Sequence, residues 1–128
     1  MKLRIHENSL RLRVNRPDVE ALRRDGSIEH RLNVTAEAAL VYRLEIDDCA
    51  VPEAALVAAE GGSMIIVRLP GPLAERWFDE REVAVTASVD IAGGAPLELL
   101  IEKDFACLIP RDGEDSDTYF ANPAKSQD

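Results

Sequence analysis

The chain has 128 residues and a formal net charge of −9, because 24 Asp and Glu residues outnumber 15 Lys and Arg residues. This length suits one domain whose core is large enough to fold without disulfides. The negative charge disfavours sequence-independent DNA binding and adhesion to an anionic membrane. The charge is uneven, however, because residues 1–45 carry nine basic and seven acidic side chains.

The sequence also bears on the cellular compartment. No apolar run approaches the roughly 18 residues that a membrane span needs. Residues 1–6 alternate apolar and charged side chains where a signal peptide would be continuously apolar. Cys49 and Cys107 are too few for a disulfide framework and lack CxxC spacing. We therefore expect a cytoplasmic protein without a membrane segment.

The first predicted elements are a hairpin and a short helix. Residues 2–6 and 10–14 alternate apolar and charged side chains, which is typical of a hairpin with one wet face. Asn15 can then cap a helix, Pro17 suits its first turn, and Asp18 completes a capping box. Val19 and Leu22 form the buried stripe of this helix, and Gly26 ends it.

Two further hairpins are predicted after this helix. Residues 28–34 and 40–46 alternate in the same way, and His30 shares an apolar strand face. We therefore expect His30 to be partly buried and hydrogen bonded. Residues 55–59 and 64–69 flank a glycine pair, which favours a tight turn between two strands.

The last predicted elements are a second helix and a fourth hairpin. Pro70, Gly71 and Pro72 start a helix that carries Leu73, Trp77 and Phe78 on its apolar face. Residues 83–91 and 97–101 then form two strands joined at Gly93 and Gly94.

These elements repeat when position i is laid on position i+55. Pro17 then falls on Pro72, and Ile28 falls on Val83. We predict a mainly β fold with two short helices, of the α+β class, in which a tandem strand-helix-hairpin repeat builds a pseudo-two-fold β-barrel or sandwich. The predicted single domain covers residues 1–104, with repeats at about 2–49 and 55–104, and an acidic C-terminal tail covers residues 105–128.

The repeated unit resembles the swapped-hairpin barrel of AbrB-type transition-state regulators, in which two units make one barrel. The resemblance lies in the sequence Gly-Ser-Met-Ile-Ile-Val-Arg-Leu-Pro at residues 62–70 with the helix that follows, and in Leu-Arg-Arg at residues 22–24. It implies a DNA-binding transcriptional regulator. The first repeat lacks the Gly-Arg before the apolar strand and the proline directly after it.

A larger part of the chain resembles small bacterial proteins grouped only as a domain of unknown function. Residues 1–14 and 101–108 carry this resemblance. It implies a bacterial, single-domain, cytoplasmic protein and assigns no functional residue.

The best candidate binding residues are basic side chains in the first third of the chain. Outward arginines on a hairpin can follow a phosphate backbone or an acidic protein surface, or can simply keep an exposed face soluble. The candidates are Lys2, Arg4, Arg11, Arg13, Arg23, Arg24 and Arg31. Aromatic residues for base stacking are scarce in this half, so a single-stranded nucleic acid is disfavoured.

No motif indicates catalysis or a cofactor. The two histidines and two cysteines have no zinc-type spacing, and the chain contains no GxSxG elbow and no phosphate-binding glycine loop. We therefore predict no catalytic residue, no metal and no cofactor.

Two apolar residues, Ile66 and Leu100, fall on strand faces that should be wet. A partner, the tail or a dimer interface could cover them. The tail combines Phe105, Leu108, Ile109, Tyr119 and Phe120 with an acidic run at residues 112–117. We predict a non-enzymatic protein-binding or self-associating module, with a DNA-binding regulator as the alternative.

Overall fold

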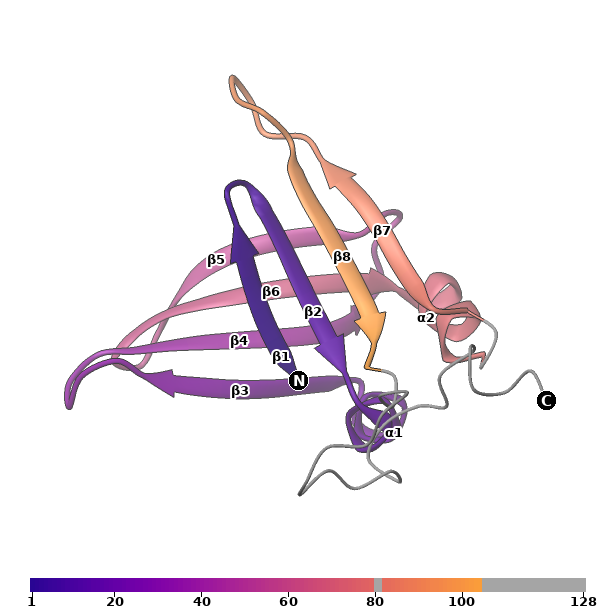
Figure 1. Ribbon diagram of the computed structural model, residues 1–128, viewed down its shortest axis with the longest axis horizontal. Helices are drawn as coiled ribbons and strands as arrows, with labels where there is room; N and C mark the ends of the chain where they lie inside the picture. Colours follow the sequence, from indigo (N-terminus) through magenta and orange to yellow (C-terminus); the bar gives the residue numbers. More distant parts are fainter. Residues whose placement is uncertain (80–81, 105–128) are drawn as a thin grey trace, which may run out of the picture.

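The computed structural model describes residues 1–79 and 82–104, and this part of the chain is mainly β with two helices (Figure 1). In chain order the elements are β1 (Lys2–His6), β2 (Ser9–Val14), α1 (Arg16–Asp25), β3 (Ser27–Asn33), β4 (Ala39–Asp47), β5 (Glu53–Ala59), β6 (Gly62–Pro70), α2 (Gly71–Phe78), β7 (Ala84–Val89) and β8 (Leu97–Lys103). The predicted order of hairpins and helices is thus confirmed. The predicted acidic tail lies outside the described residues.

The strands form two four-stranded sheets. Sheet A has the order β1-β2-β8-β7, and sheet B has the order β3-β4-β6-β5. In each sheet two antiparallel hairpins meet at a central parallel pair, β2 with β8 and β4 with β6. The strands of the two sheets cross at a steep angle (Figure 1). Neither sheet closes on itself, so the barrel alternative is wrong and the architecture is a sandwich. A barrel would need ladder hydrogen bonds between the edge strands.

The two repeats exchange hairpins between the sheets. The first unit, β1 to β4, places hairpin β1–β2 in sheet A and hairpin β3–β4 in sheet B. The second unit, β5 to β8, places its first hairpin in sheet B and its second in sheet A. The helix of each unit makes the crossing from one sheet to the other. Each sheet is therefore complete only when both repeats are present.

The strand registers obey an internal two-fold relation, but they correct the predicted alignment. An offset of 55 residues relates β2 to β6, whereas an offset of 57 relates β4 to β8, because Leu12 pairs with Ile101 and Leu44 pairs with Val67. Ile28 is consequently equivalent to Val85, which is also buried. The predicted match of Ile28 to Val83 is wrong, since Val83 is 41% exposed and lies in the longer connection between α2 and β7.

The caps of α1 are as predicted. The Asn15 side chain accepts a hydrogen bond from the Asp18 amide at 2.9 Å, and the Asp18 carboxylate accepts one from the Asn15 amide at 3.1 Å. Gly26 ends the helix with a φ of 82°, a left-handed conformation that glycine adopts without strain. Val19 and Leu22 are buried, as the predicted stripe requires.

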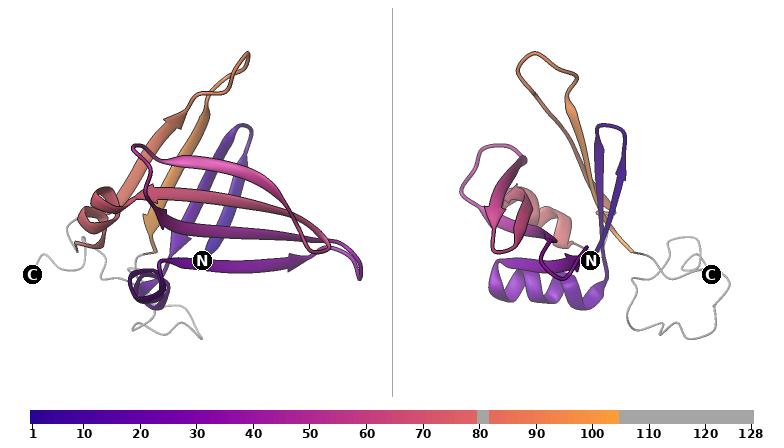
Figure 2. Two further views of the ribbon diagram at one scale, coloured as in Figure 1. Left: turned by 180° about the vertical axis from the view of Figure 1, so that it is seen from behind. Right: turned by 90° about the vertical axis from the view of Figure 1, so that its left-hand side faces the viewer.

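The core lies between the sheets and is closed at one end by both helices. Its most completely buried apolar side chains come from every layer: Leu12, Val14, Leu22, Leu44, Val67, Leu69, Trp77 and Ile101. The turn ends of each sheet extend beyond the other sheet, away from the helices (Figure 2). Apolar side chains on these overhanging ends have no opposing layer. Within the described ranges, no helix is long and apolar enough to cross a membrane.

Candidate functional site

An apolar groove opens where the inner faces of the two sheets separate. Sheet A contributes Ile5, Leu10 and Leu97, and sheet B contributes Ala54, Leu56 and Ile65. The groove has a volume of about 310 Å³, and Glu7, Asn8 and Ser9 of the β1–β2 hairpin supply polar groups at its rim. Ile5 is 60% exposed and Leu56 is 70% exposed. Such a concentration of exposed apolar side chains is typical of a binding surface.

The groove is bordered by an edge strand without charged side chains in its interior. β5 is the last strand of sheet B, and residues 54–59 read Ala-Ala-Leu-Val-Ala-Ala. Edge strands usually carry charges, prolines or bulges that prevent pairing with another chain. The edge strand β1, which the internal two-fold relates to β5, carries Lys2 and Arg4. The unprotected edge is therefore a property of the second repeat.

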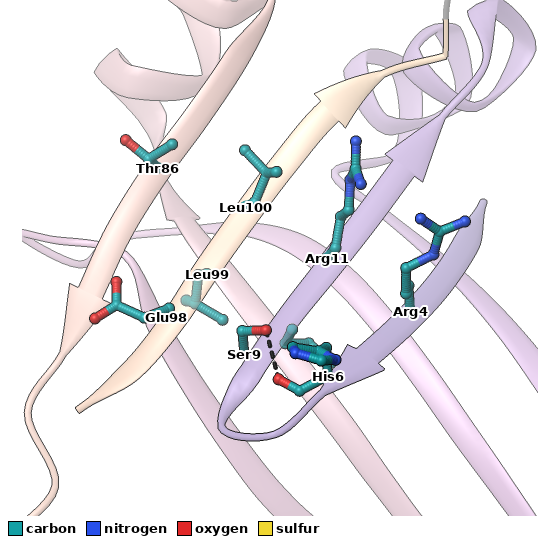
Figure 3. Close-up of a pocket in the computed structure, with 9 residues that line it drawn as sticks. Arg4, His6, Ser9, Arg11, Thr86, Glu98, Leu99 and Leu100 are labelled. Atoms are coloured by element: carbon teal, nitrogen blue, oxygen red, sulfur yellow. Dashed lines mark hydrogen bonds between the residues drawn. The ribbon is translucent and has the colours of Figure 1, made fainter. Parts of the chain in front are cut away.

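A second hollow, lined by both charged and apolar side chains, lies on the outer face of sheet A (Figure 3). It has a volume of about 570 Å³, and Arg4 and Arg11 face each other across the β1–β2 ladder at its side. Leu100 lies on the neighbouring strand beside Arg11, with Thr86 beyond it. The remaining polar groups are His6, Ser9 and Glu98. This hollow contains two of the predicted basic binding residues.

One carboxylate neutralises much of the basic charge next to this hollow. The guanidinium groups of Arg11 and Arg13 both donate to Glu102 Oε1, from Nε at 2.5 and 2.6 Å respectively. Burial alone would raise the pKa of Glu102, but the two arginine hydrogen bonds outweigh it and hold the pKa below its ordinary value. Glu102 thus stays ionised at neutral pH, and its charge reduces the attraction of this face for a phosphate backbone.

The structure does not bring Arg23, Arg24 or Arg31 to this face. Arg23 lies over the Phe78 ring at 5.4 Å, and Arg24 forms an ion pair with Asp25 at 3.0 Å in the last turn of α1. Arg31 belongs to sheet B and donates to the side chain of Asn33 at 3.1 Å. Lys2, by contrast, lies opposite Arg13 on the outer face of sheet A, where Asp104 pairs with it at 3.2 Å. The basic set is therefore divided among separate surfaces.

The two predicted interface residues lie on different outer faces. Ile66 is on the outer face of sheet B between Arg43 and Ala55, yet it is only 5% exposed in the single chain. Leu100 is half-buried in the hollow on the outer face of sheet A. Ile66 does not need a partner to leave water, and contact of either residue with another chain stays a prediction.

His30 is partly buried at the edge of sheet B. Its side chain is 44% exposed, and its ring lies 5.7 Å from the ring of Tyr42. The histidine is thus partly buried, although Leu32 next along the same face is 53% exposed. A hydrogen-bonding contact does exist, at 3.4 Å from His30 Nε2 to the Met1 nitrogen.

The described residues form neither a reactive thiol site nor a metal site. Burial, followed by the negative charges of Glu53 and Asp47, raises the pKa of the Cys49 thiol, so this thiol is mostly protonated at neutral pH. Cys107 lies outside the described residues. In the part of the chain that the structure covers, no three His, Cys, Asp or Glu side chains are placed to hold a metal ion.

Comparison with known proteins shows which family the chain belongs to. A model of a family of unknown function, DUF7009, matches residues 1–124. The chain belongs to this family. No curated protein and no solved structure matches it. The predicted membership in a domain of unknown function is confirmed, and the resemblance to AbrB-type regulators stays a prediction.

Sequence reasoning missed the groove and its edge strand. It identified residues 55–59 as a strand but could not tell a central strand from an edge strand. A signal was present, since residues 54–59 form six consecutive apolar positions without the alternation of a half-wet strand. Only the sheet order shows that this strand has one free edge.

Proposed function

We propose that this member of the family is a non-enzymatic module that binds an extended protein segment along β5 and in the adjoining groove. The observation that carries the proposal is the exposure of Ile5 and Leu56 at the mouth of an apolar groove beside a free sheet edge. In a single chain these side chains remain in water, and a bound segment would remove them from it.

The two parts of the site have complementary roles in such binding. A free strand edge offers main-chain hydrogen bonds, which hold an extended segment with little regard to its sequence. Alternate side chains of that segment would point toward the groove, because side chains alternate along a strand. The groove therefore determines which segments bind. It favours apolar side chains inside the groove and, next to them, side chains that can lie beside Glu7 and Asn8 at its rim.

Selection from a displayed random peptide library on the full-length protein tests this function. We expect enrichment of extended, apolar and β-branched peptides that bind the wild type and fail to bind Leu56→Lys. Leu32→Lys is the matched control, since Leu32 is also an exposed leucine on an edge strand of sheet B. Failure to enrich any peptide, or equal binding to both variants, would contradict the proposal.

DNA binding is the second candidate function, because hairpins exchanged between sheets are what the resemblance to AbrB-type regulators implies. The ionised Glu102 between Arg11 and Arg13 weakens this candidate. We expect no binding of a labelled mixed-sequence duplex in low salt by fluorescence anisotropy. Binding that is abolished by Arg4→Glu and weakened by added salt would instead support the regulator.

A further inference from the structure

We propose that the segment bound by β5 is β5 of a second copy, paired antiparallel across a two-fold axis so that the two B sheets form one continuous eight-stranded sheet. This inference rests on the proposed function, because it uses the same edge. The partner it names is the chain itself.

The sequence of β5 is compatible with pairing to itself. In an antiparallel pair centred on Leu56, the two leucines lie opposite each other and Ala55 lies opposite Val57. Glu53, the only charged residue of the strand, lies opposite Ala59. No like charges meet, and apart from the two Glu53–Ala59 pairs at the ends the cross-strand pairs are apolar.

The two edge strands that carry charges fit such pairing less well. Antiparallel pairing of β1 centred on Arg4 would place two arginines directly opposite each other, which is destabilising. β3 exposes Glu29, His30 and Arg31, whose charged or polar groups would lose water on pairing.

The remaining edge strand, β7, has no charges but gains less from a partner. Its apolar Val85 is already buried, and its exposed side chains are Thr86 and Ser88. β5 is thus the described edge strand that combines an absence of like-charge contacts with large exposed apolar side chains, Leu56 and Val57.

The internal two-fold provides a comparison within the molecule. Because Lys2 pairs with Arg13 and Glu53 with Arg68, Arg4 in β1 is equivalent to Ala55 in β5. The same relation makes Ile5 equivalent to Leu56, and both are exposed on the inner faces. The two edge strands therefore occupy equivalent positions in their sheets. They differ because the interior of β1, unlike that of β5, carries charges that would prevent pairing.

Sedimentation of the full-length protein over a wide concentration range tests the inference. We expect a monomer–dimer equilibrium whose dissociation constant rises at least about tenfold in Leu56→Lys. The substitution replaces two leucines buried in the dimer by two positive charges that face and repel each other. Leu32→Lys should leave the dissociation constant unchanged. Circular dichroism of both variants should match the wild type, because both leucines are exposed.

A crosslink provides a second measurement that depends on geometry. In a Cys49→Ser, Cys107→Ser background, Leu56→Cys should form a disulfide-linked dimer with an added oxidant, because a residue on the two-fold axis faces its own copy. Leu32→Cys should not crosslink at the same protein concentration.

Three outcomes would overturn the self-pairing: a monomer at every concentration, a dimer indifferent to Leu56→Lys, or equal crosslinking of the two cysteine variants. A monomer that still binds library-selected peptides through Leu56 would overturn only the self-pairing and leave the proposed function standing. A wild-type protein that neither dimerises nor binds any library peptide would contradict both proposals.

Discussion

At the scale of single residues, Glu102 determines the electrostatic character of the outer face of sheet A. Its side chain is 13% exposed and accepts hydrogen bonds from two arginines on β2. Two guanidinium groups side by side on one strand face would otherwise repel each other, and the shared carboxylate offsets this repulsion. The basic hairpin that the sequence suggests is therefore partly neutralised by a residue about ninety positions away.

The stability that Glu102 provides should depend on pH with a definite sign. A carboxyl group whose pKa is lower in the folded than in the unfolded state stabilises the fold above its unfolded pKa and loses this contribution as the pH falls through the folded pKa. We expect Glu102→Gln to lower the free energy of unfolding by about 1 kcal/mol at pH 7.

Urea unfolding of the wild type and Glu102→Gln at several pH values measures this difference. The gap should close in acid, as the pH falls through the pKa of the folded Glu102 carboxyl, which lies below the ordinary glutamate value. Glu98→Gln is the matched control on the same strand face and should have a smaller effect, because the Glu98 carboxylate accepts a hydrogen bond from the neutral Ser88 hydroxyl at 3.0 Å. A gap that persists unchanged in acid would contradict the assignment.

At the scale of elements, the close pairing of β4 with β6 depends on a glycine. The Ala39 and Gly62 positions are partners in the parallel ladder, and a Cβ added to Gly62 would lie 1.9 Å from the Ala39 carbonyl oxygen. The Ala39 amide also donates to the Gly61 carbonyl at 2.9 Å. The start of the central ladder of sheet B therefore has no room for a side chain at this point.

We expect Gly62→Ala to lower the free energy of unfolding by about 2 kcal/mol or more, because the clash is with backbone that cannot rotate away. Gly71→Ala is the matched control, since a Cβ there meets no atom within 4 Å. Thermal and urea unfolding of both variants measure the difference. Equal stability of the two variants would show that the β5–β6 turn can shift to make room.

At the scale of the whole molecule, the exchange of hairpins makes the two repeats interdependent. Hairpin β1–β2 finds its central parallel partner only in β8, and hairpin β3–β4 finds its own only in β6. A single repeat holds two separate hairpins and one helix, and an isolated hairpin is at best marginally stable in water. The molecule should therefore unfold as one cooperative unit.

Separate expression of residues 1–50 and 51–128 tests this interdependence. We expect each half to lack the circular dichroism of the folded chain on its own and to recover it when the halves are mixed. When one half is titrated with the other, the circular dichroism signal should stop changing at a 1:1 molar ratio of the two halves. A half that shows cooperative unfolding by itself would contradict the interdependence that the sheet order implies.

The sequence alone determined features that depend on near neighbours in the chain. The capping box at Asn15 and Asp18, the glycine that ends α1 at Gly26, and the alternation of each strand involve groups only a few residues apart. The same local patterns revealed the duplication. The family match over residues 1–124 is likewise a property of the sequence.

Only the tertiary structure decided how these elements combine, because strand order and register depend on contacts between distant residues. The sheet order shows a sandwich and not a barrel, and it shows that β5 has a free edge. The strand registers show that the offset between the repeats is 57 residues, and not 55, in the second part of the repeat. Local alternation states which side chains share a face but not which layer, if any, covers that face. For this reason the exposed groove at Ile5 and Leu56, on which the proposed function rests, could be found only in three dimensions.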